Sequence, residues 1–112
     1  MEKLIADLDT QLKFLNFKRT EGQAIVEKQN TEGIERHRDA LRAIMKTVES
    51  QKLQIEQAKF ANGEAPKDVA AWSSEIEEQQ AAVDEEIAQL TKRLNELILG
   101  SRSSWSKRAG NN

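Results

Sequence analysis

The sequence predicts an all-α fold, namely an antiparallel helical hairpin or coiled coil with a long N-terminal helix. Apolar residues recur at every seventh position over long stretches, which is the repeat of a coiled-coil seam. Glycine and proline come close together only in Asn62-Gly63-Glu64-Ala65-Pro66, near the middle of the 112-residue chain. Charged residues make up 32% of the chain and aromatic residues only 4%, as is typical of a thin helical seam.

Each side of this central turn, residues 62–66, is predicted to be a helix. Gly63 can end the first helix because glycine readily adopts the left-handed conformation, and Pro66 suits the first turn of the next. Gly100, in Leu99-Gly100-Ser101, predicts the end of that second helix. The seam residues are Ile34, Leu41, Val48 and Ile55 before the turn, and Val69, Ile76, Val83, Leu90 and Leu97 after it.

Folding the chain at the central turn predicts the register of the hairpin, in which facing residues have numbers that add to about 129. This register brings the basic residues Arg42 and Lys46 towards the acidic stretch 84–86. An exposed ion pair contributes only ~0.2–1 kcal/mol, so we expect charge to select the register rather than to supply stability. The apolar pairs expected from the register are Phe60 with Val69, Leu53 with Ile76, Met45 with Val83, Leu41 with Ile87 and Ile34 with Leu94.

The first third of the chain allows two interpretations. One is a continuous helix over residues 3–61, favoured because no proline or loop-like cluster separates residues 1–33 from residues 34–62. Gly22 and Gly33 would then be weak points that cost ~1 kcal/mol each relative to alanine. The alternative is a break near residues 30–33 and a spectrin-like three-helix bundle.

We expect residues 1–99 to form the helical domain and residues 100–112 to form a flexible basic tail. The tail carries three basic residues and no acidic one. Such a segment can be a solvated linker, or it can contact nucleic acid through phosphate binding and base stacking. The residues for that contact are Arg102, Trp105, Lys107 and Arg108.

The side chains offer little for catalysis. There is no cysteine, and the single histidine, His37, is expected to be a seam or flank residue. The carboxylates of residues 75–86 lack the loop spacing of a calcium site and the Glu-x-x-His pairs of a di-iron site, so they indicate a solvated acidic face. We therefore expect no enzyme activity, metal, cofactor or small-molecule substrate. Hydropathy predicts no membrane contact, and the lack of cysteine favours an intracellular, cytoplasmic protein.

Apolar side chains near the N-terminus exceed what one helical hairpin can bury. Leu12, Phe14, Leu15 and Phe17 cover more than one helix face, so either a third helix or another chain must cover the surplus. Trp72 is expected to cover the open end of the hairpin near Phe60 or to anchor a partner. The candidate interaction residues are Leu8, Leu12, Phe14, Leu15, Phe17 and Trp72.

Three short runs, at residues 38–44, 59–64 and 72–77, are similar to N-terminal helical segments of Gag-like proteins from invertebrate retroelements. The resemblance covers about residues 35–98. It implies a segment that precedes a capsid region and helps assembly. No zinc knuckle, capsid homology region or protease motif accompanies it.

The function expected from these patterns is structural: helix-mediated self-association or scaffolding, with a second copy or another helical protein as partner. Two alternatives remain. One is a nucleic-acid-binding adaptor acting through the basic tail. The other is an adaptor that holds a partner helix on Leu12, Phe14 and Phe17.

Overall fold

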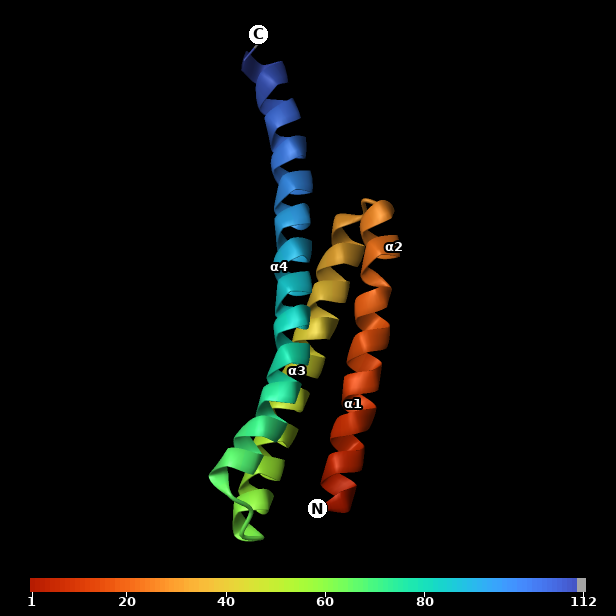
Figure 1. The fold of residues 1–112 in the computed structure, drawn as a ribbon. Helices are drawn as coiled ribbons and strands as arrows, with labels where there is room; N and C mark the ends of the chain where they lie inside the picture. The colour runs from red at the N-terminus through yellow and green to blue at the C-terminus, as the bar shows by residue number, and fades with distance from the viewer. Residues whose placement is uncertain (111–112) are drawn as a thin grey trace.

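The computed structural model describes the backbone of residues 1–110 and the side chains of residues 1–100. Within that range it contains helices and no strand, which confirms the all-α fold. The helices are α1 (Glu2–Thr20), α2 (Gly22–Glu27), α3 (Thr31–Ala61) and α4 (Pro66–Gly110). The molecule is a rod with principal extents of 72 × 21 × 16 Å (Figure 1).

The hairpin of α3 and α4 forms at the predicted turn. Gly63 has a φ of 82°, which is accessible to glycine without strain, and α4 begins at Pro66. Lys52 Nζ lies 3.3 Å from Glu77 Oε1, and the Ser73 hydroxyl donates to Glu56 Oε2 at 2.6 Å. Both pairs have residue numbers that add to 129, so the predicted register is confirmed.

The faces of α3 differ in part from the prediction. Leu53 and Phe60 are exposed, because they lie off the stripe defined by residues 34, 41, 48 and 55. Within residues 1–100, no ion pair joins Arg42 or Lys46 to Asp84, Glu85 or Glu86. Among these residues, Lys52 and Glu77 form an ion pair between the two helices instead.

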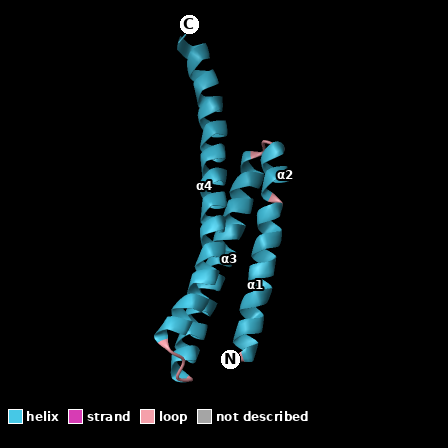
Figure 2. Ribbon diagram, viewed as in Figure 1, coloured by secondary structure: helices cyan, strands magenta, loops and turns pink. Residues whose placement is uncertain are grey.

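The favoured continuous helix over residues 3–61 is wrong. The chain reverses at residues 28–30, where Gln29 has a φ of 53°, and α3 then runs antiparallel to α1 (Figure 2). Asn30 caps α3, since its side-chain oxygen accepts from the backbone N–H groups of Glu32 and Gly33. The position of Met1 confirms the reversal, because Met1 Sδ lies 3.8 Å from Asn62 Nδ2, at the same end of the rod.

Three helical segments therefore lie side by side, as in the three-helix alternative. α1 and α2 run in nearly one direction, with a local interruption at Glu21, and α1 packs chiefly on α3 (Figure 1). The core combines apolar side chains of α1, α3 and α4. Its buried members are Leu8, Leu12, Leu15, Ile34, Leu41, Ile44, Met45, Val48, Ile55, Ile76, Val83, Leu90 and Leu94.

The predicted end of the second helix at Leu99-Gly100-Ser101 is also wrong, because α4 continues to Gly110. Extending the register of the hairpin places Thr31, the first residue of α3, level with Ile98. Residues 99–110 therefore project beyond the rest of the bundle by roughly 18 Å at 1.5 Å per residue. Figure 1 shows this end of α4 standing clear of α2 and α3.

Candidate interaction surfaces

The first surface is the outer face of α1. Leu8, Leu12 and Leu15 are buried in the chain's own core. Phe14 and Phe17 lie on other faces of the same helix and are 44% and 57% exposed. Lys18 lies beside Phe14, with its Nζ 5.7 Å from the centroid of the ring. The structure thus divides the predicted cluster into three core leucines and two outward phenylalanines.

Trp72 belongs to the tip of the hairpin. Its ring is half-buried and packs against the core, and Lys59 Nζ lies 5.3 Å from the ring centroid. Lys59 also pairs with Glu64 at 3.3 Å. Trp72 therefore covers this end of the hairpin, while Phe60, its expected neighbour there, is exposed.

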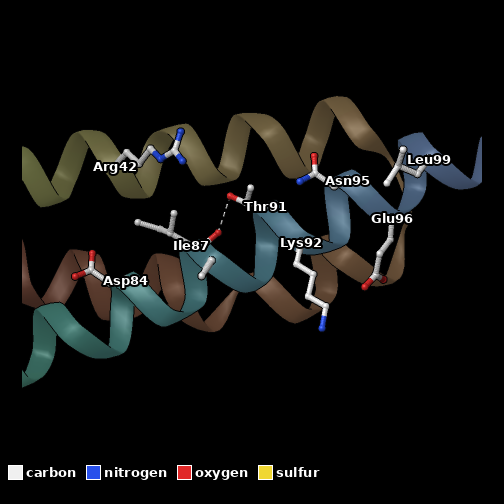
Figure 3. Close-up of a pocket in the computed structure, with 9 residues that line it drawn as sticks. Arg42, Asp84, Ile87, Thr91, Lys92, Asn95, Glu96 and Leu99 are labelled. Atoms are coloured by element: carbon white, nitrogen blue, oxygen red, sulfur yellow. Dashed lines mark hydrogen bonds between the residues drawn. The ribbon is translucent and has the colours of Figure 1, made fainter.

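The second surface is the C-terminal part of α4. Ile98 and Leu99 are 42% and 59% exposed where α4 leaves the bundle. An open groove between α3 and α4 leads to this end (Figure 3). Arg42 comes from α3, and the other lining residues come from α4: Asp84, Ile87, Ala88, Thr91, Lys92, Asn95, Glu96 and Leu99.

This groove was not predicted from the sequence. The signal for it is Leu97-Ile98-Leu99, because three consecutive apolar residues on a helix cannot all face one neighbour. Leu97 is half-buried against the core, which leaves Ile98 and Leu99 outside it. The predicted tail contacts Arg102, Trp105, Lys107 and Arg108 have side chains outside the described residues.

A buried polar junction lies in the N-terminal part of α3, where α1, α2 and α4 meet it. His37 is only 5% exposed, and its Nε2 has no hydrogen-bond partner among the described residues. Burial lowers the pKa of His37 below its ordinary value, and Lys18 acts in the same direction. Glu21 and Glu86 favour the charged imidazole and oppose this shift, as does the backbone of Lys18.

Gly22 explains how α2 approaches α4 at this junction. A Cβ at Gly22 would overlap a Glu86 carboxylate oxygen and would lie 3.5 Å from His37 Nε2. The absence of a side chain at residue 22 thus leaves room for both polar groups. His37 was expected to be a seam or flank residue, and its burial places it on the seam.

Two further properties concern metals and membranes. Within the described part of the chain, no group of three or more His, Asp or Glu side chains could hold a metal ion. No helix there is both long and apolar enough to cross a bilayer.

Comparisons with family models, with curated proteins and with solved structures find no match to this chain. The fold and the surfaces alone therefore define its class, an all-α helical bundle with a projecting helix.

Proposed function

We propose that this chain is a non-enzymatic structural module that self-associates through its helices. The observation that carries the proposal is the projecting end of α4, where Ile98 and Leu99 remain exposed after the three helical segments have packed. Phe14 and Phe17 give α1 a second outward apolar surface. Clusters of exposed large apolar side chains on a helix are a common mark of contact with another protein.

The expected association is weak for a single pair of surfaces. Burying one large apolar side chain contributes ~1.5–3 kcal/mol, while association costs about 4–15 kcal/mol in lost freedom. A few such side chains in each copy therefore exceed this cost only narrowly, and the dimer should depend strongly on concentration. Such weak association suits a scaffold, in which many copies reinforce one another.

The resemblance of residues 35–98 to Gag-like assembly segments supports the same kind of function. In that setting the module would bring together the larger proteins of which it is a part. Both arguments lead to association through helices, and the argument from the exposed Ile98 and Leu99 does not need the resemblance.

Sedimentation equilibrium at tens to hundreds of micromolar tests the proposal. We expect a concentration-dependent dimer or larger species. Ile98→Ala with Leu99→Ala should weaken it, and Phe14→Ala with Phe17→Ala should show whether α1 contributes to the same species. A strict monomer over this range would refute self-association.

A further inference from the structure

A stripe of α4 is left uncovered by the rest of the bundle. Asp84, Ala88, Thr91 and Asn95 follow one another at spacings of four, three and four residues, which places them on one face of the helix. All four line the open groove of Figure 3, and Ile98 continues the stripe onto the projecting end. Thr91 is half-buried and the others are exposed, so the stripe can accept another helix.

The stripe is complementary to itself in size and polarity when it is read in the opposite direction. In an antiparallel pair of α4 helices that cross near residue 93, facing residues have numbers that add to 186. The small Ala88 then faces the larger Ile98 of the other copy, and Thr91 faces Asn95. Two-fold symmetry repeats each contact, so every match occurs twice.

The charges along α4 favour the same arrangement. Residues 75–86 contain six carboxylates and no basic residue, whereas residues 100–110 contain three basic residues and no acidic one. An antiparallel pair lays the basic end of each copy along the acidic stretch of the other, and its register places position 102, an arginine, opposite Asp84. A parallel pair would lay acidic on acidic segments and basic on basic segments, which is unfavourable.

The lengths of the helices also fit a second copy. The projecting residues 99–110 extend past the first residue of α3, so they reach beyond the helix on which the rest of α4 packs. In the antiparallel register they would lie along residues 76–87 of the other α4. The overlap of the two helices is then about 50 Å long at 1.5 Å per residue.

We infer that the uncovered stripe of α4 binds a second copy of this chain, as an antiparallel two-fold α4–α4 pair that crosses near residue 93. The inference deepens the proposed self-association and rests on it. It selects α4 rather than the phenylalanines of α1 as the primary interface. Lys92 and Glu96, which flank the crossing, give each copy one positive and one negative side chain to offer the other.

A charge exchange between positions 84 and 102 tests the register. In a dimer of Asp84→Arg, both members of each facing 84–102 pair are basic. In a dimer of Arg102→Asp, both members are acidic. Each variant alone should therefore dimerise about ten-fold or more weakly than the wild type in sedimentation equilibrium at low salt. An equimolar mixture should recover an affinity close to that of the wild type, because each 84–102 pair again has opposite charges.

Three outcomes contradict the inference, and they separate it from the proposed function. A wild type that dimerises while the mixture is no tighter than either variant would retain self-association and remove this interface. A mixture much tighter than the wild type would indicate a parallel pair, in which positions 84 and 102 each face themselves. A wild type that stays monomeric would remove both proposals. Far-UV circular dichroism of each variant shows that the helices are intact.

Discussion

The chain reverses twice, and the two reversals are built differently. At residues 62–65 the left-handed residue is Gly63, with a φ of 82°, and Pro66 opens the next helix. At residues 28–30 the left-handed residue is Gln29, with a φ of 53°, and Asn30 caps the next helix. The central turn uses glycine and proline, which are conspicuous in a sequence. The turn at residues 28–30 uses ordinary polar residues.

The difference shows what each turn depends on. Gly63 adopts its conformation at no steric cost, so the central turn is favoured locally. A left-handed residue other than glycine costs roughly 1–2 kcal/mol, which packing elsewhere must offset at Gln29. The packing that does so is that of Leu8, Leu12 and Leu15 in the core shared with α3. The turn at residues 28–30 is thus a consequence of tertiary structure.

The largest effect on stability is expected from removing the packing that supports the turn at residues 28–30. Leu15 is 1% exposed, so Leu15→Ala should lower the free energy of unfolding by about 2–5 kcal/mol. Phe17→Ala on the same helix is the matched control and should cost much less, because Phe17 is 57% exposed. Equal and small effects in urea denaturation would mean that α1 does not pack on α3.

A smaller effect on stability is expected from placing glycine at the left-handed position of one turn and removing it from the other. Gln29→Gly should raise the free energy of unfolding by about 0.5–1 kcal/mol, because glycine relieves the left-handed conformation. Gly63→Ala should lower it by about 1 kcal/mol at a site with open space around the new Cβ. Thermal unfolding would contradict the account if both changes had the same sign.

The smallest expected effect is a dependence on pH at the end of the rod that carries residues 28–30. The folded pKa of His37 is below its ordinary value of 6.5, so the unfolded chain takes up this proton first as pH falls. His37 should therefore leave stability unaffected above about pH 6.5 and reduce it below that pH. Glu21 and Glu86 keep the effect small by favouring the charged imidazole.

His37→Leu removes the titrating group and, with it, a buried Nε2 that has no hydrogen-bond partner within residues 1–100. The variant should lose the His37 part of the pH dependence between pH 7 and 5. Denaturant midpoints that decline equally with acid in the variant and the wild type would contradict the assignment to His37.

The hairpin could be predicted from the sequence because its signals are local and periodic. Heptad spacing and the Gly63 turn fixed a register that Lys52 with Glu77 and Glu56 with Ser73 confirm. The reversal at Gln29 could not be predicted in this way, since residues 28–30 contain neither glycine nor proline. Gly100 led to the wrong prediction of a helix end. Glycine inside a helix costs only about 1 kcal/mol, and α4 continues through it.

The candidate surfaces were predicted unevenly. A surplus of apolar residues around Phe14 and Phe17 was visible in the sequence, and both side chains are exposed. The groove along α4 was not, because it depends on which face of α4 the packing of α3 leaves open. The length of the projecting end was not predicted either, since it follows from the reversal at residues 28–30 and from α4 continuing past Gly100.

The most direct test of the account is the distance between residues 5 and 60. The chain has no cysteine, so Ile5→Cys with Phe60→Cys gives a doubly spin-labelled chain at two exposed sites. Dilution with excess unlabelled chain removes distances between copies. Neighbouring antiparallel helices predict a label separation on the order of 10–25 Å, given interaxial distances of ~8–10 Å. A distribution centred near ~80 Å, the length of a continuous helix between these residues, would contradict the account.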